Sequence, residues 1–217
     1  MRAMSTLAAL FTAAALGAAA ASGKTLPFTT LASGQAAPAA APLRPQAFVS
    51  VDRAFIYVFA YGGRFPTHDY ALAVTSVALS HGVLVVRASW GFPPMPFLVH
   101  PGEAVPFQVL RIPRRAVGDR APRSALLVQV HSGVRPHMSL AALLSRVSNA
   151  ATRLRSATLF GIADAIPLSW PFGGAVLPGA TWFLTMDGNA ACGNRNAPTG
   201  FYVMEDRTGQ IFGCGVP

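Results

Sequence analysis

Residues 55–61 read Phe-Ile-Tyr-Val-Phe-Ala-Tyr, and this stretch decides the fold class. Successive side chains of a β-strand point to opposite faces, so the four aromatic residues share one face and the aliphatic residues share the other. Because both faces are apolar, the pattern predicts a central and largely buried strand. The aromatic face is either part of the core or the lining of a groove for a peptide or a glycan.

More strands are expected on both sides of short turns that follow this stretch. Gly62-Gly63 ends the first strand, and residues 70–88 form a hairpin that reverses at 80–82. Two further strands are expected at 107–112, between Pro106 and Pro113, and at 124–131. The prolines suit the edge of a sheet or the end of a strand, because proline cannot donate to the ladder.

One α-helix is expected to begin after Ser139, whose hydroxyl can accept a hydrogen bond from a free backbone N–H. Apolar residues then recur at helical spacing, at Leu140, Leu143, Leu144, Val147, Ala151 and Leu154. The other face carries Arg146, Arg153 and Arg155. The apolar face either docks on the sheet or places the helix on an anionic membrane; we expect docking.

The C-terminal part is expected to contain strands at 182–186, 201–204 and 210–212, with a hairpin turn at 205–209. The whole chain is therefore predicted to be mainly β, a β-rich α+β protein with small antiparallel sheets and one amphipathic helix.

The order of these segments resembles the C-terminal domain of the PrcB family, a protease-complex subunit. The resemblance spans residues 54–116 and rests on the strand begun by Tyr70, on Gly-Val-Leu-Val-Val at 82–86, and on Pro-Phe-Gln-Val-Leu-Arg-Ile-Pro-Arg at 106–114. His68-Asp69 stands where the family has Gly-Gly. Such domains are short, β-rich and secreted, so the resemblance implies an accessory or binding module. Residues 120–217 resemble no family that we recognise.

The N-terminus is typical of an exported protein. An apolar, alanine-rich run follows Met1-Arg2 and ends in Ala19-Ala20-Ala21, which predicts a signal peptide at 1–21. The run has about 15 residues, fewer than the ~20 that a membrane span needs. Residues 22–47 are expected to be an Ala/Pro-rich linker. Two folded parts are expected to follow, a PrcB-like β domain at 48–118 and a helix plus hairpin region at 119–217.

The only two cysteines are Cys192 and Cys214. Because the chain is expected to reach an oxidising compartment, we expect a disulfide between them. On the chain-entropy model, closing this loop would stabilise the fold by roughly 3 kcal/mol. The alternative is that Cys192 is a nucleophilic thiol, which would need a nearby base.

Positive charge is concentrated in the middle of the chain. Between residues 111 and 155 the sequence has nine arginines and one acidic residue, Asp119. This band, including Arg114, Arg115, Arg146, Arg153 and Arg155, is either a site for an anionic envelope polymer or lipid, or a result of base composition. Nucleic acid is not expected as a partner, because no recognition motif accompanies the charge.

An exposed apolar loop is expected at 91–97, because its prolines favour an extended path outside a sheet. A stiff loop loses little entropy on binding, so a partner contact is one hypothesis. The other is a cover over the sheet edge. The residues of the contact hypothesis are Phe92, Pro93, Pro94, Met95 and Phe97.

The sequence contains none of the common catalytic or cofactor-binding motifs. We therefore predict no catalytic residue, no metal and no cofactor, with His68-Asp69 as the pair to test if the chain were a hydrolase. The expected function is a non-catalytic accessory or protein-interaction module that is secreted, periplasmic or in the cell envelope. Its partner could be a secreted protease or another envelope protein. The alternative is binding to an anionic envelope surface through the arginines.

Overall fold

A computed structural model describes residues 23–91, 101–118, 121–147, 153–162, 164, 166–167, 170, 173–175, 179–187 and 199–215. These residues form mainly β structure with one α-helix, which confirms the expected fold class. In this part of the chain, no helix is long and apolar enough to cross a membrane.

The larger sheet has eight strands in the order β1-β6-β7-β9-β10-β11-β12-β13. In that order their bounds are Lys24–Thr25, Ala71–Ser80, Val83–Gly91, Ser124–His131, Arg153–Phe160, Thr181–Asp187, Thr199–Glu205 and Ile211–Gly215. β9 pairs in parallel with both β7 and β10, and the other neighbours are antiparallel. The expected hairpin at 70–88 is β6–β7, and it turns on His81 and Gly82, which both have positive φ.

The smaller sheet has the order β2-β8-β4-β3, with β5 also paired to β8. These strands are Thr29–Ala36, Pro101–Pro113, Phe55–Tyr61, Gln46–Val51 and Phe65–Thr67. Two short 3-10 helices flank it, η1 at Pro38–Ala40 and η2 at Arg114–Ala116. β8 lies between β2 and β4, so of the two positions that the prolines suited the sheet edge is wrong, and Pro113 stands at the end of the strand.

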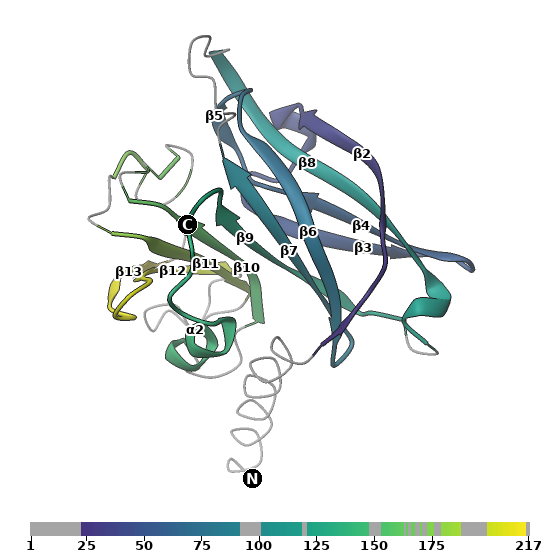
Figure 1. The fold of residues 1–217 in the computed structure, drawn as a ribbon. Coiled ribbons are helices and arrows are strands. Elements are labelled where there is room, and N and C mark those ends of the chain that lie inside the picture. The colour runs from purple at the N-terminus through teal and green to yellow at the C-terminus, as the bar shows by residue number, and fades with distance from the viewer. Residues whose placement is uncertain are drawn as a thin grey trace.

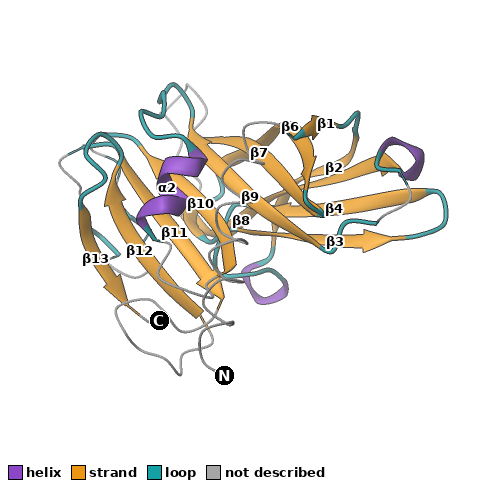
Figure 2. Ribbon diagram, turned by 90° about the horizontal axis from the view of Figure 1, so that it is seen from below, coloured by secondary structure: helices purple, strands orange, loops and turns teal. Residues whose placement is uncertain are grey.

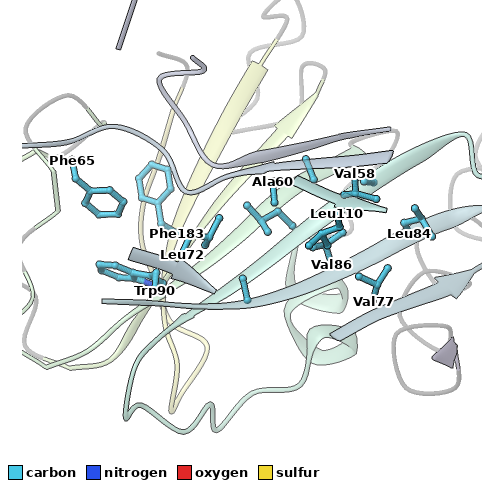
Figure 3. Close-up of a cluster of buried hydrophobic side chains, with 14 of the residues drawn as sticks. Val58, Ala60, Phe65, Leu72, Val77, Leu84, Val86, Trp90, Leu110 and Phe183 are labelled. Carbon is cyan, nitrogen blue, oxygen red and sulfur yellow. The ribbon is translucent and has the colours of Figure 1, made fainter. Parts of the chain in front are cut away.

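The two sheets pack face to face around one buried cluster (Figure 1). Val58 and Ala60 of β4 and Leu110 of β8 face Val86 and Leu84 of β7 (Figure 3). The cluster also contains residues of β9 to β12, so strands before and after residue 118 share one sheet and one core. The expected boundary at 118/119 therefore does not separate two domains.

The helix α2, Leu140–Arg146, covers the outer face of the larger sheet (Figure 2). Ser139 caps it as expected, with its Oγ accepting a hydrogen bond from Ala142 N at 3.1 Å. Leu140, Leu143 and Leu144 are buried in a second cluster with side chains of β7, β9, β10, β11 and β12. This is the sheet docking that the leucine spacing predicted.

The helix is shorter than expected. It ends at Arg146, and Leu154 lies in strand β10. β10 pairs with β9 on one side and with β11 on the other, so its backbone hydrogen bonds go to two neighbouring strands. This tertiary pairing outweighs the helical spacing of its apolar residues. The expected extension of the helix to residue 154 is wrong.

The expected linker at 22–47 is also wrong over most of its length. Residues 29–36 form β2, which pairs along β8 from Arg111 to Val105, and β3 begins at Gln46. Most β2 side chains are exposed, so main-chain hydrogen bonds to β8 hold this strand in place of apolar burial. The expected signal peptide at 1–21 lies outside the described residues.

Candidate functional site

The outer face of the smaller sheet is lined with aromatic side chains. We call this surface the aromatic face; it consists of Phe48 of β3, Phe55, Tyr57, Phe59 and Tyr61 of β4, and Phe107 of β8. All six are partly exposed, and Phe48 reaches 42% exposure. The opposite side of β4 is fully buried, so the core takes the aliphatic face. The expected central position of β4 is confirmed, since β4 lies between β8 and β3, but its aromatic side is only partly buried.

Neighbouring rings of the aromatic face contact one another. The ring centroids of Phe48 and Tyr61 are 6.1 Å apart in an edge-to-face arrangement, and those of Tyr61 and Phe107 are 6.2 Å apart. Such contacts favour a small number of ring orientations. Three adjacent strands therefore present a continuous and ordered apolar surface.

A hollow lies at one end of this surface. Its floor is Phe48, Phe59 and Tyr61, and its wall is formed by residues 39–42, which include the last two residues of η1. The hollow has a volume of about 550 Å³. Among the residues that the structure describes, the lining has no charged side chain, since the wall consists of three alanines and Pro42. A partner's apolar side chain would lose little by desolvation on entering it.

The other end of the aromatic face is basic. The Arg111 guanidinium lies 4.7 Å from the centroid of the Phe55 ring, a cation–π contact. Arg53 lies in the β3–β4 turn. Arg114 and Arg115 directly follow β8 and lie beside the same turn, because Arg114 N donates a hydrogen bond to Ala54 O. Together with Asp52, these four arginines give this end a net charge of +3.

Asp52 fixes the β3–β4 turn. Its Oδ1 accepts hydrogen bonds from Phe55 N at 2.6 Å and Ala54 N at 2.7 Å. These backbone bonds lower the pKa of Asp52, and its hydrogen bond with the Tyr57 hydroxyl raises the pKa of that tyrosine. The Asp52 carboxylate thus forms its hydrogen bonds within the turn. The electrostatic potential at this end of the aromatic face is therefore set by the arginines.

The predicted arginine site does not form a single surface. Arg114 and Arg115 belong to η2, which lies at the end of the molecule away from α2 and its Arg146 (Figure 2). Arg155 pairs with Asp187 on the neighbouring strand. The side chain of Arg153 lies outside the described residues. Only Arg114 and Arg115 of the predicted set border the aromatic face.

Several predicted site residues cannot be placed. Phe92, Pro93, Pro94, Met95 and Phe97 of the apolar loop lie outside the described residues, as does Cys192. Cys214 lies in β13 and is not a free thiol. Its pairing with Cys192 stays a prediction.

A histidine–carboxylate pair occurs elsewhere than expected. His131 Nδ1 lies 3.3 Å from Asp164 Oδ2, at the carboxyl ends of the parallel strands β9 and β10. A carboxylate at Nδ1 leaves Nε2 as the position for proton exchange. In the described residues, Nε2 has no hydroxyl or thiol partner that could act as a nucleophile. The pair packs on Trp90, whose ring centroid is 4.9 Å from that of His131.

His68, the histidine singled out for the hydrolase alternative, is exposed beside Gly102. Nowhere in the described ranges do three or more histidine, cysteine or acidic side chains gather as a metal site would require.

The sequence carries a signal for the solvent side of β8 and β3, although not for β4, whose two faces are both apolar. Arg111 follows Phe107 and Val109 at the two-residue period, so it shares their side of the strand. An arginine in that row indicates solvent on that side. In β3, Ser50 follows Phe48 with the same spacing.

No protein-family model, no curated protein and no solved structure matches this chain. The resemblance of residues 54–116 to the PrcB C-terminal domain therefore stays a prediction.

Proposed function

We propose that this protein is a non-catalytic binding module that docks a protein partner on its aromatic face. The observation that carries the proposal is the row of six partly exposed aromatic side chains on a sheet whose opposite side is the core. Contiguous exposed apolar surface is typical of interaction sites. Tyrosine, phenylalanine and arginine, the residues gathered here, are also enriched at protein interfaces.

The positive charge at one end of the aromatic face indicates which chemical groups a partner should carry. Four arginines and one carboxylate border the apolar centre. A partner with an apolar patch flanked by acidic residues would complement both parts and would be attracted over a distance at low salt. A protein partner is favoured over a polyanion, because the described residues that line the hollow beyond the arginines are uncharged and mostly apolar.

The expected export of the chain places this partner in the cell envelope or outside the cell. A secreted protease is the partner class that the PrcB resemblance implies, and other envelope proteins are the second class. The His131–Asp164 pair does not change this proposal, since no nucleophile accompanies it in the described residues.

The proposal can be tested by affinity capture from an envelope extract of the source cells. The bait would be wild type, the double variant Phe48→Ser/Tyr61→Ser, or the control Phe212→Ser. Phe212 is a matched control because it is also 42% exposed but lies in β13 of the other sheet. All three baits should have similar thermal stability, because the changed side chains are surface residues.

We expect wild type and Phe212→Ser to retain the same secreted protein in stoichiometric amount, and the double variant to lose it. Equal retention by all three baits would contradict the proposal. If the baits retained a glycan or an anionic polymer and no protein, the aromatic face or the arginines would bind that ligand. This result would also contradict the proposal of a protein partner.

A further inference from the structure

The wall of the hollow on the aromatic face is held in place before any ligand binds. Residues 39–42 form this wall, and Pro38 and Leu43 flank it in the chain. The backbone N–H of Arg64 donates to Leu43 O at 3.0 Å, and Nη2 of the same residue donates to Pro38 O at 3.4 Å. Both ends of the wall are thus attached to the chain that follows β4. A ligand that fills the hollow therefore has little protein order to impose.

The aromatic face offers hydrogen-bond donors to a peptide and no amide or carboxylate acceptor. Its six side chains are all phenylalanine or tyrosine. The Tyr61 hydroxyl at the hollow can donate to a carbonyl, and the Arg111 guanidinium on Phe55 brings further donors. A peptide of ordinary residues carries N–H groups, and those that meet the rings lose water without gaining an acceptor. Proline has no N–H, so a proline-rich segment brings only carbonyl acceptors to this surface.

A polyproline II helix also matches the row of rings in shape. Such helices dock on aromatic-lined grooves of binding modules, and they are already extended before they bind. Phe59 and Tyr61 lie in the floor of the hollow, and Tyr57 and Phe55 continue the same row along β4. A ligand that leaves the hollow along β4 therefore stays on aromatic rings until it reaches the basic end.

The length of β4 sets the spacing within the ligand. Phe59 and Tyr61 are four and six residues from Phe55, the ring that contacts Arg111. At about 3.3 Å per strand residue, the hollow and the basic end are about 13–20 Å apart. A polyproline helix rises about 3.1 Å per residue, so about four to six of its residues cover this distance.

The basic end selects the charge of the ligand beyond its prolines. Arg53 and Arg115 are exposed there, beside Arg111 and Arg114, and Asp52 is the one acidic residue of the β3–β4 turn. The net charge of +3 at this end is complementary to acidic side chains.

We propose that the aromatic face binds an extended, proline-rich segment of its partner, with acidic residues about four to six positions from the prolines in the hollow. The prolines lie on Phe48, Phe59 and Tyr61, and the acidic residues pair with the arginines beside the β3–β4 turn. This inference rests on the proposed function and names the part of the partner that is recognised.

The first test is the fluorescence anisotropy of labelled peptides that are titrated with the purified protein. The probes are hexaproline joined to tetra-aspartate in both chain orders, so that either direction of the segment is tested. Each control peptide changes one part: one has tetralysine in place of the aspartates, and the other has glycine and serine in place of the prolines. We expect at least one proline–aspartate probe to bind wild type with one peptide per chain. Each control peptide should bind at least about tenfold more weakly.

Two variants test the hollow. Phe48→Ser/Tyr61→Ser should lower the affinity of the probe by about tenfold or more, because it removes two rings from the floor. Phe212→Ser removes an equally exposed ring from the other sheet and should bind the probe as wild type does.

Two further variants test the basic end. Arg53→Gln/Arg115→Gln should lower the affinity about fivefold at about 0.1 M salt, and the difference from wild type should vanish at about 1 M salt. Arg135→Gln/Arg207→Gln is the control, because it removes the same charge from exposed positions before α2 and in the β12–β13 turn. It should bind the probe within about twofold of wild type at both salt concentrations.

A glycine–serine peptide that binds as tightly as the proline probes would show attraction by charge alone and would overturn the proposal. Equal binding of the lysine peptide would overturn it as well, and so would an affinity that Phe48→Ser/Tyr61→Ser leaves unchanged. The result is separable from that of the affinity capture. A captured partner that needs Phe48 and Tyr61, with no binding of either proline probe, would leave the proposed function standing and refute the proline-rich ligand. Equal retention by all baits would contradict the proposed function and this inference with it.

A second measurement locates the peptide on the protein. The probe carries p-benzoylphenylalanine at its proline end, which forms a covalent bond to nearby C–H groups on irradiation. Mass spectrometry of the digested product should find the crosslinks at residues 39–48 or 59–61, which include the wall and the floor of the hollow. Crosslinks confined to α2 or β13 would place the peptide elsewhere and would overturn the proposal.

Discussion

Trp182 Nε1 donates a 2.6 Å hydrogen bond to Asp206 Oδ1, and this contact ties the middle of the larger sheet to the turn after β12. The same carboxylate accepts the backbone N–H groups of His137 and Met138, just before α2. One buried side chain thus connects β11, the β12–β13 turn and the segment that leads into the helix. Its removal leaves three donors without their partner.

Asp206→Ala should therefore be strongly destabilising. We expect the free energy of unfolding in urea to fall by about 2–3 kcal/mol, because the buried Trp182 Nε1 loses its acceptor at a cost of about 1–3 kcal/mol and the part-buried N–H groups of His137 and Met138 lose theirs at a smaller cost. The free energy of unfolding should fall by less in Asp206→Asn, because asparagine keeps one acceptor oxygen. Asp187→Ala, which breaks the more exposed pair with Arg155, should change stability by about 1 kcal/mol or less. Equal losses for Asp206→Ala and Asp187→Ala would contradict the role of Asp206.

Gln129 joins the two sheets through its side-chain amide. It is fully buried, and its Nε2 donates to Gly62 O and Thr158 Oγ1, both at 3.0 Å. Gln129→Leu should lower the unfolding free energy by about 1–3 kcal/mol, because the Gly62 carbonyl loses its donor in the core. The exposed Gln210→Leu is the control and should change stability by about 0.5 kcal/mol or less. An unchanged urea midpoint for Gln129→Leu would refute this assignment.

Gly63 is required by two independent constraints. Its φ is +90°, and a Cβ there would lie 2.5 Å from Trp170 Cζ2 and 2.8 Å from Pro45 Cδ. Gly133 has a similar φ of +85° but open space around the Cβ position. Gly133→Ala should cost only backbone strain, about 1–2 kcal/mol. Gly63→Ala should lower the melting temperature clearly further, because it adds a collision with the core. Similar melting temperatures for the two variants would contradict the packing at Gly63.

Tyr70 makes stability depend on alkaline pH. Burial, with a smaller contribution from the Asp164 charge, raises the pKa of Tyr70 from 10.0 to about 12. Between these values the unfolded chain loses the phenolic proton and the folded chain keeps it, so stability falls as pH rises. The contribution of Tyr70 is complete below about pH 10. Urea unfolding between pH 9 and 12 should show a shallower decline for Tyr70→Phe than for wild type. Parallel pH dependences of the unfolding free energy in the two proteins would contradict the raised pKa of Tyr70.

Many of the strand positions could be predicted from local patterns, although their order in the sheets could not. The hairpin β6–β7 is predicted by its turn residues, His81 and Gly82, and the helix cap is predicted by Ser139 directly before Leu140. Both signals are local in sequence. β2 was not visible, because its alanine, glycine and serine side chains lack apolar alternation and its partner β8 is about 75 residues away. Likewise, the parallel pairing of β9 with β7 and β10 leaves no local signal.

The candidate site was predicted only in part. Phe55, Tyr57, Phe59 and Tyr61 were placed on one face correctly, but the side that faces the core could not be chosen from β4 alone, where both faces are apolar. Arg111 in the adjacent strand resolves the choice only once the pairing of Tyr57 with Arg111 is known. The His131–Asp164 pair and the hydrogen bond between Trp182 and Asp206 both depend on long-range contacts, which periodicity does not reveal.

The most direct test of the proposed function is the affinity of the captured partner, once purified, for three forms of the protein. These are wild type, Phe48→Ser/Tyr61→Ser and Phe212→Ser. Loss of two central aromatic contacts should weaken binding by about 30-fold or more, since interface hot spots contribute 2 kcal/mol or more each. Phe212→Ser should bind as wild type does. A double variant that binds with unchanged affinity, or a Phe212→Ser variant that loses as much, would contradict docking on the aromatic face.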